Sequence, residues 1–94
     1  MASTIRYSSH AVARMFERGI SETDVRLILE KGELIFQYPE DRPFPSKVLL
    51  GWKMETPIHV VVADDVEHDI SVVITTYIPD PKLWDDEFKR RRTS

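Results

Sequence analysis

The part of the chain that most restricts its fold is a series of four short runs rich in strand-forming residues. These runs are residues 33–38, 47–54, 58–63 and 70–78, and Val, Ile, Leu, Thr and Tyr are frequent in them. The connections between them are too short for a helical crossover, so consecutive strands must run in opposite directions. The longest connection, PEDRPFPS at residues 39–46, contains three prolines and must be a loop. The sequence therefore predicts a four-stranded antiparallel sheet built from hairpins.

Two helices are predicted ahead of the sheet. In residues 8–18, four apolar side chains fall on one face at about 100° per residue, and they are Ala11, Val12, Met15 and Phe16. Ser8 or Ser9 can cap the start of this helix, and Gly19 is placed to end it. The second helix begins after Ser21, a good N-cap with Asp24 at the capping-box position. Its apolar stripe is Val25, Ile28 and Leu29, and it closes at Lys31 and Gly32.

The C-terminal residues 79–92, PDPKLWDDEFKRRR, predict a short third helix. Asp80 followed by Pro81 is typical of an N-cap and first-turn pair, and Trp84 and Phe88 are four residues apart. Acidic residues precede basic ones, which is the order that a helix dipole favours. The predicted fold is therefore α+β, a single domain over residues 1–94. It has two N-terminal helices packed on a four-stranded antiparallel sheet, with a short C-terminal helix.

Composition limits the classes of protein to which this chain can belong. A chain of 94 residues, 41% of them hydrophobic, suits one modest core. It has no cysteine, which excludes disulfides, thiolate zinc sites and cysteine nucleophiles and fits a cytoplasmic location. The longest apolar stretches, IHVVVA and ISVVIT, are too short to cross a bilayer, so no membrane partner is expected. The net charge is −3, so any contact with nucleic acid must come from local clusters of cations.

A histidine and two arginines follow one another at four-residue intervals on the first predicted helix. His10, Arg14 and Arg18 advance by about 40° per step, so they form a slanted row at the border of the apolar face. An arginine at such a border commonly pairs with a carboxylate while its stem covers apolar surface. The alternative is that the three residues form a working site. The sequence leaves both interpretations open.

The last two strands bring polar side chains to one face of the predicted sheet. Their more apolar rows are Ile58, Val60 and Val62 on one strand and Ile70, Val72 and Ile74 on the other. If both rows face the helices, His59 shares the open face with Thr75 and Tyr77. These groups suit proton transfer or the binding of a phosphate, since histidine changes protonation near neutral pH. The structural interpretation is that His59 is a hydrogen-bonded spacer between good strand residues.

No metal or cofactor is expected. The three histidines, His10, His59 and His68, form no His-x-x-x-His pair, and no compact carboxylate cluster accompanies them. There is no glycine-rich phosphate loop and no dinucleotide fingerprint.

The strongest electrostatic feature is KRRR at residues 89–92, which includes Arg90 and Arg91. As a tail, this cluster can lie on RNA or DNA or stay solvated. Trp84 and Phe88 are expected to pin the tail to the body of the protein rather than to stack on bases.

Five stretches read together resemble a known family. They are SSHAVARMFERGISETDV, YPEDRPFPS, LLGW, IHVVVA and ITTYIPDPKLW. Their order and spacing resemble a small bacterial domain-of-unknown-function family, number 4258. Its pattern reads His-Ala-x-x-Arg-Met-x-x-Arg-Gly-Ile, then Tyr-Pro-x-Asp, His-Val-Val and Thr-x-Tyr-x-Pro. The resemblance spans nearly the whole chain, and the matching polar positions are His10, Arg14, Arg18, Asp41, His59 and Tyr77.

That family looks like a distant branch of the RelE/ParE toxins, in which helices precede an antiparallel sheet. The resemblance implies the toxin of a type II toxin–antitoxin system, a metal-independent endoribonuclease that cleaves mRNA, on the ribosome or free of it. Its implied partner is a zinc-finger-type antitoxin protein. As a hypothesis, His59 and His10 divide proton transfer, Tyr77 orients the phosphate or stacks on a base, and Arg14 and Arg18 hold the phosphate. Arg90 and Arg91 then add contacts to RNA.

Two other functions fit the same sequence. One is a non-catalytic protein-binding module, an inactive toxin relative that docks another chain through the proline-rich loop and a sheet edge. The other is a gyrase-directed inhibitor of the ParE kind, which shares the predicted fold.

Overall fold

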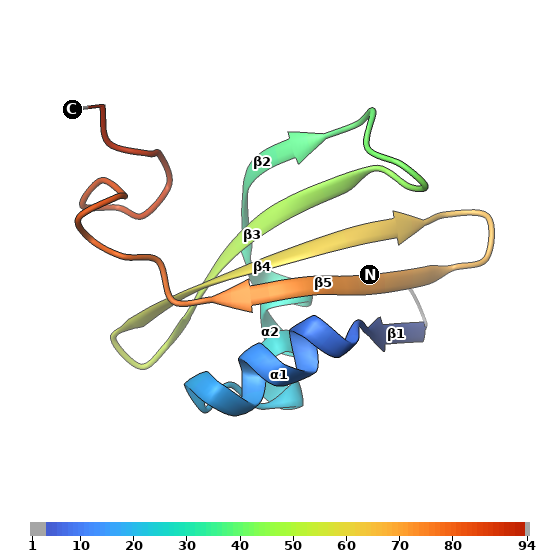
Figure 1. The fold of residues 1–94 in the computed structure, drawn as a ribbon, viewed down its shortest axis with the longest axis horizontal. Helices are drawn as coiled ribbons and strands as arrows, with labels where there is room; N and C mark the ends of the chain where they lie inside the picture. The colour runs from blue at the N-terminus through green and yellow to red at the C-terminus, as the bar shows by residue number, and fades with distance from the viewer. Residues whose placement is uncertain (1–3, 94) are drawn as a thin grey trace.

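Five strands form one sheet with two helices on one side of it in the computed structural model of the chain, which describes residues 4–93 (Figure 1). The order along the chain is β1 (Thr4–Tyr7), α1 (Ser9–Arg18), α2 (Glu22–Lys31), β2 (Glu33–Tyr38), β3 (Ser46–Lys53), β4 (Thr56–Asp65) and β5 (Ile70–Tyr77). Across the sheet the strands follow the order β1-β5-β4-β3-β2. The strands β2 to β5 pair antiparallel in sequence order, as hairpin connections require.

The predicted four-stranded antiparallel sheet is wrong in one respect, because the sheet is five-stranded and mixed. The additional strand, β1, pairs parallel to β5, from Thr4 opposite Ile70 to Tyr7 opposite Val73. The backbone of Ser8 continues this contact by donating to the Val73 carbonyl at 3.0 Å. A run of four residues is too short for an alternating pattern to stand out. Its partner strand lies at the other end of the chain, so local sequence gives no sign of the pairing.

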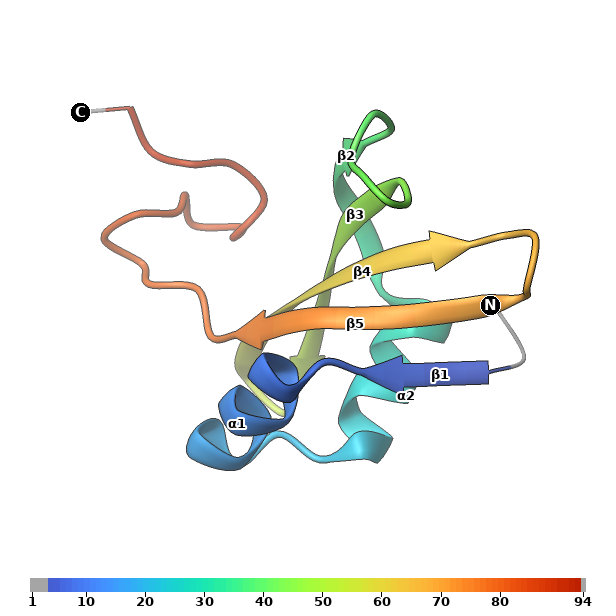
Figure 2. The same ribbon diagram turned by 45° about the vertical axis from the view of Figure 1, so that its right-hand side comes forward.

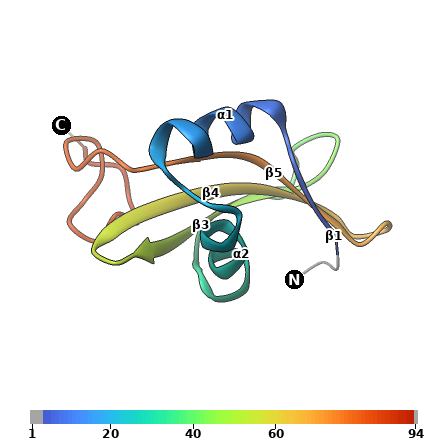
Figure 3. The same cartoon turned by 90° about the horizontal axis from the view of Figure 1, so that it is seen from below.

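Both predicted N-terminal helices are confirmed, together with their caps. The Ser8 hydroxyl accepts from the Ala11 amide at 3.0 Å, and Gly19 ends α1 in the left-handed conformation at φ 66°. Ser21 and Asp24 form a capping box at the start of α2. Figure 3 shows α1 lying along β5 while α2 crosses β3, and these are the strands that each helix contacts most.

The main core lies between these helices and one face of the sheet. Its buried members are Ala11, Met15, Ile20, Val25, Ile28, Leu49, Ile58, Val60, Val62 and Val73. The apolar face predicted for α1 included Phe16, but Phe16 is 90% exposed, so the buried face of the helix is narrower than predicted. Gly51 of β3 lets Ile28 approach the sheet backbone, since a β-carbon at residue 51 would overlap the Ile28 side chain.

An irregularity in β5 changes which of its side chains face the helices. The pairing of β4 with β5 shifts between Val61 and Val62, which leaves Ile74 without a direct partner. As a result Val73 and Thr76 are fully buried, whereas Ile74 is partly exposed. The predicted row containing Ile74 was therefore wrong for this strand, because regular alternation does not anticipate a bulge.

The predicted C-terminal helix is absent from the structure. Residues 79–93, hereafter the C-terminal strap, form a series of turns that lies across the sheet face opposite the helices (Figures 1 and 2). One turn does begin at Asp80, whose carbonyl accepts from the amides of Leu83 and Trp84 at 2.9 and 3.0 Å. After it Trp84 pairs with Arg91 in an isolated bridge.

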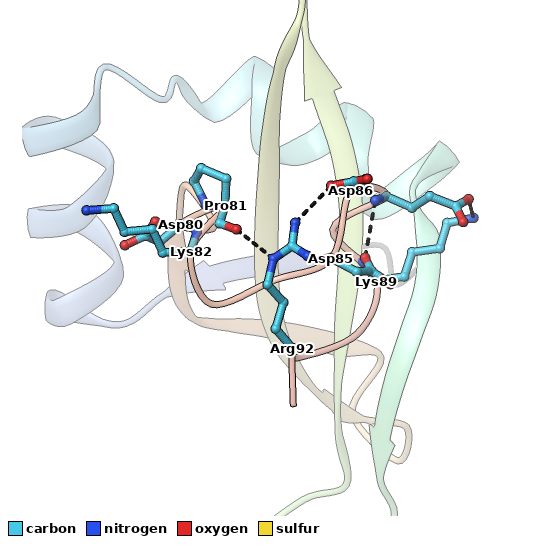
Figure 4. A network of polar contacts seen from close by, with 8 residues as sticks. Asp80, Pro81, Lys82, Asp85, Asp86, Lys89 and Arg92 are labelled. Carbon is cyan, nitrogen blue, oxygen red and sulfur yellow. Dashed lines mark hydrogen bonds and ion pairs between the residues drawn. The ribbon is translucent and has the colours of Figure 1, made fainter. Parts of the chain in front are cut away.

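Side chains of the strap satisfy its backbone in place of helical hydrogen bonds. The Asp85 carboxylate accepts from the amides of Glu87 and Lys89 at 3.2 and 3.1 Å, a local bond that competes with helix formation. Arg92 donates to the Pro81 carbonyl at 2.9 Å and to the Asp86 carboxylate at 2.8 Å (Figure 4). The acidic residues that were expected to favour a helix dipole instead tie the strap to itself.

Candidate functional site

The sheet face opposite the helices carries a second buried cluster, and His59 lies at its centre. On β4, Ile58 and Val60 point into the main core, so His59 between them points to the other face. It is directly opposite Leu50 of β3 and Tyr77 of β5. The expected juxtaposition of His59 and Tyr77 is therefore confirmed. The face is not open as predicted, because the C-terminal strap covers it and His59 is 0% exposed.

Both ring nitrogens of His59 have hydrogen-bond partners. Nε2 lies 2.7 Å from the Phe88 carbonyl oxygen, and Nδ1 lies 3.2 Å from the Tyr77 hydroxyl. A carbonyl can only accept, so Nε2 must carry the proton and donate it to Phe88. In the neutral ring, Nδ1 then accepts from the Tyr77 hydroxyl. The strap thus fixes the tautomer of His59 and the direction of the bond to Tyr77.

Aromatic rings enclose the imidazole. The Trp84 ring lies edge-on to it with 4.5 Å between centroids, and the Tyr77 ring lies at 5.2 Å. Phe36 packs against Trp84 at 6.0 Å, and Trp52 packs against Phe88 at the same separation. Burial among these rings lowers the pKa of His59, and its hydrogen bond to the strap opposes that effect only in part. The ring is therefore neutral at pH 7.

Tyr77 is the member of the pair that solvent reaches, since its side chain is only partly buried. Burial raises the pKa of Tyr77, with a contribution from Tyr38, while Arg91 acts in the opposite direction. The phenol therefore stays protonated at neutral pH. The guanidinium of Arg91 lies over the Trp84 ring, 5.5 Å from its centroid, so a cation is held beside the pair.

The row on the first helix lies on the other side of the sheet from His59. α1 packs on β5 through Ala11 and Met15 in the main core, whereas His59 faces the C-terminal strap. His10 and Arg18 are exposed, and Arg14 pairs with Glu17 of its own helix at 2.6 Å. The sheet therefore separates these three residues from His59 and Tyr77. Their assigned roles in proton transfer and phosphate binding stay predictions that this geometry does not support.

The strap that covers His59 carries cations of its own. Lys89 pairs with Glu33 at 3.0 Å and with Glu87 at 3.4 Å, and the hydrogen bond that Lys89 donates to Glu33 raises the pKa of Lys89. Arg90 and Arg91 are exposed. The expectation that Trp84 pins the tail to the body is confirmed, since Trp84 is only 5% exposed. Reasoning from the sequence missed the Phe88 carbonyl, because a backbone group that orients a distant histidine leaves no residue signature.

Other polar groups named from the sequence have structural roles. Asp41 accepts from the Ser46 hydroxyl at 2.5 Å and so ties the proline-rich loop to the start of β3. His68 bonds to Asp65 at 2.9 Å in the turn between β4 and β5. Within residues 4–93, no group of three or more His, Cys, Asp or Glu side chains is arranged to hold a metal ion. No helix in this range has the length and apolar character needed to span a membrane.

Comparison with known proteins gives one match. No curated protein and no solved structure is similar enough to this chain to count as one. A family model described as Domain of unknown function (DUF4258) matches residues 7–78, which include His59 and Tyr77 but end just before the C-terminal strap. These are 72 of the 94 residues, and the match shows that the chain belongs to the DUF4258 family.

Proposed function

We propose that this protein is the toxin of a bacterial type II toxin–antitoxin system, a distant RelE/ParE relative that cleaves mRNA in the cytoplasm without a metal ion. Its partners are mRNA, free or on the ribosome, and a zinc-finger-type antitoxin. The observation that carries the proposal is the hydrogen-bonded pair of Tyr77 and His59, fixed from behind by the Phe88 carbonyl and flanked by Arg91. A neutral base behind a protonated hydroxyl, with a cation beside them, suits cleavage of an RNA phosphodiester.

The proposed reaction runs through the solvent-accessible phenol. The 2′-hydroxyl of the RNA gives its proton to the Tyr77 oxygen while the Tyr77 proton passes to Nδ1 of His59. The 2′-oxygen attacks the phosphorus, the bond to the 5′-oxygen breaks, and that oxygen takes a proton from water. The products are a 2′,3′-cyclic phosphate and a 5′-hydroxyl. The Phe88 carbonyl stabilises the imidazolium that forms, because Nε2 keeps its proton throughout.

The strap provides the charge that the proposed RNA contact requires. Lys89, Arg90, Arg91 and Arg92 are consecutive, and because Lys89 and Arg92 already pair with carboxylates, Arg90 and Arg91 are the cations of this run that are available to a phosphate. In this proposal, Arg91 balances negative charge that develops on the phosphate, and its position over Trp84 and its effect on the pKa of Tyr77 support that role. Exposed Tyr38 and Trp52 offer rings on which bases can stack. Binding should therefore weaken steeply as salt concentration rises.

The test is cleavage of a fluorescent single-stranded RNA, with and without ribosomes and in the presence of EDTA. Tyr77→Phe removes only the hydroxyl, and we expect it to lower the rate at least about 100-fold, the usual contribution of a proton-transfer group. Tyr38→Phe is the matched control, because it removes the hydroxyl of an exposed tyrosine. Cleavage that survives Tyr77→Phe but is lost in Arg14→Ala would place the site on α1 instead.

The complete burial of His59 favours a second candidate, the non-catalytic protein-binding module. In that case His59, Tyr77 and Phe88 hold the strap in place and perform no chemistry. RNA that stays intact with and without ribosomes, at protein concentrations well above those used for known ribonucleases, would support this candidate and refute the first. A DNA-gyrase supercoiling assay on the same preparation tests the ParE-like alternative.

A further inference from the structure

We propose that the free edge of β2 and the C-terminal strap together bind an extended, acidic segment of a partner protein, which adds to the sheet as a sixth strand beside β2. The site is a groove lined by Glu33–Phe36 of β2 and Lys89–Arg91 of the strap, hereafter the edge groove. Tyr77 does not line the groove, although Arg91 lines it and also acts on Tyr77, and the inference does not depend on RNA cleavage.

The groove opens at the edge of the strand. In the sheet order β2 is outermost and pairs with β3 alone. The groove is lined by four consecutive residues of β2, Glu33, Leu34, Ile35 and Phe36. Because successive side chains of a strand point to opposite faces, a surface that includes all four must run along the strand's edge. Such an edge presents backbone N–H and C=O groups, to which another strand can bond.

The dimensions suit a short extended peptide. The groove has a volume of about 520 Å³. The four residues of β2 that line the groove span roughly 13 Å at about 3.3 Å per residue, so about four residues of a partner can lie along it. The pairing with β3 is irregular between Leu34 and Phe36, whereas Phe36 to Tyr38 follows a regular register. Because Phe36 is the only residue of this regular stretch that lines the groove, we expect the partner strand to pair from Phe36 back along Glu33–Ile35, beside the cations of the strap.

The charges in the groove select an acidic partner. The wall opposite β2 is formed by three consecutive cations, Lys89, Arg90 and Arg91. Lys89 already pairs with Glu33 and Glu87, but no carboxylate within residues 4–93 forms an ion pair with Arg90 or Arg91. A partner that carries carboxylates at alternate positions can place them against this wall.

The apolar side chains of the groove complete the expected pattern. Leu34 is 45% exposed and lies opposite Leu49 on the helix side of the sheet, whereas Phe36 is partly exposed and lies opposite Val48 on the strap side. A segment in which acidic and β-branched residues alternate presents carboxylates on one face and apolar groups on the other. A peptide fits better than RNA, because RNA has no regular series of backbone donors and acceptors to match a strand edge.

The probe is an acetylated and amidated peptide of seven residues in which Glu and Val alternate. Titration of the ¹⁵N-labelled protein should shift the amide signals of Glu33–Tyr38 more than those of β5. Reversing the charge with Arg90→Glu and Arg91→Glu together should weaken binding about tenfold or more. Arg26→Glu, a single charge reversal at an exposed position on α2, is the control and should leave binding within about twofold.

Two further peptides separate edge pairing from simple charge attraction. A peptide with Lys in place of Glu should not bind, and a peptide with alternate N-methylated amides should lose most of its affinity, because it cannot pair along an edge. The proposal is refuted if the β2 amides do not shift at about 1 mM of the first peptide, a concentration that detects even weak complexes. It is also refuted if the N-methylated peptide binds equally well. Displacement of the peptide by oligouridylate, with stronger shifts in β2, would assign the groove to RNA instead.

Discussion

Replacing Trp84 with alanine should detach the C-terminal strap while leaving the helix side of the protein intact. Trp84 is 5% exposed, and its ring contacts His59, Phe36 and the guanidinium of Arg91. A buried aromatic side chain removes about 150–250 Å² from water, and its truncation to alanine usually costs about 3–5 kcal/mol. Trp52 lies on the same face but is 53% exposed, so Trp52→Ala should cost roughly half as much. The two tryptophans therefore form a matched pair.

Three measurements follow the effect of Trp84→Ala. Urea unfolding, monitored by far-UV circular dichroism, gives the loss in unfolding free energy without relying on tryptophan fluorescence. Hydrogen exchange reports on the strap itself through the Arg92 amide, which donates to the Leu83 carbonyl at 2.8 Å and should lose its protection. Amides of β4 in the centre of the sheet should stay protected. NMR titration should show the pKa of His59 rising toward the ordinary histidine value, because burial is what lowers it.

The outcome that refutes this reasoning is specific. If Trp84→Ala costs no more than Trp52→Ala and the Arg92 amide exchanges as slowly as in the wild type, the strap is not held by Trp84. If the strap loosens but the pKa of His59 does not move, other groups desolvate the imidazole.

Further predictions concern pH, packing and capping. Because burial lowers the pKa of His59, the unfolded chain takes up this proton first, so the free energy of unfolding should fall as pH drops below about 6.5. His59→Gln should remove that contribution, and urea midpoints between pH 5 and 7.5 measure it. Gly51→Ala should lower the free energy of unfolding by about 1–3 kcal/mol, because the added methyl group overpacks against Ile28. The loss should be smaller in an Ile28→Ala background, and a double-mutant cycle measured by urea unfolding tests this. Ser21→Ala should lower the free energy of unfolding by about 1 kcal/mol because it removes the capping box, whereas Thr23→Ala should lower it much less. Thermal unfolding of the two variants measures the difference.

The sequence predicts well those features that depend on neighbouring residues. The caps at Ser8 and Ser21 and the left-handed Gly19 follow from local chemistry, and all three are present. The strands of the hairpins can also be predicted from the sequence, because β-branched residues are frequent within them and prolines mark where they end. The facing of His59 and Tyr77 was an inference from alternation, and it holds because of the bulge. Val73 faces the main core, so without the irregularity at Ile74 regular alternation would have put Tyr77 on the core side as well.

The features that were missed depend on contacts between distant parts of the chain. β1 forms because it can pair with the edge of β5, and no residue pattern within Thr4–Tyr7 indicates that pairing. Residues 79–92 carry acceptable helix signals, yet Trp84 gains more by packing on His59 and Phe36 than a short helix at the chain end would provide. The helix propensity of this segment is overridden by burial of one aromatic side chain.

The site around His59 combines residues from the region that the family model matches with residues from the C-terminal strap, which lies outside it. The match ends at Ile78, so the matched region includes His59 and Tyr77 but neither the carbonyl that orients the imidazole nor the cation beside it. In this chain both come from Phe88 and Arg91 of the strap. An imidazole on a bare sheet face would be hydrated and free to take up a proton near pH 6.5. Under the strap it is neutral and held in one tautomer, so whatever moves the strap also changes the chemistry available to Tyr77.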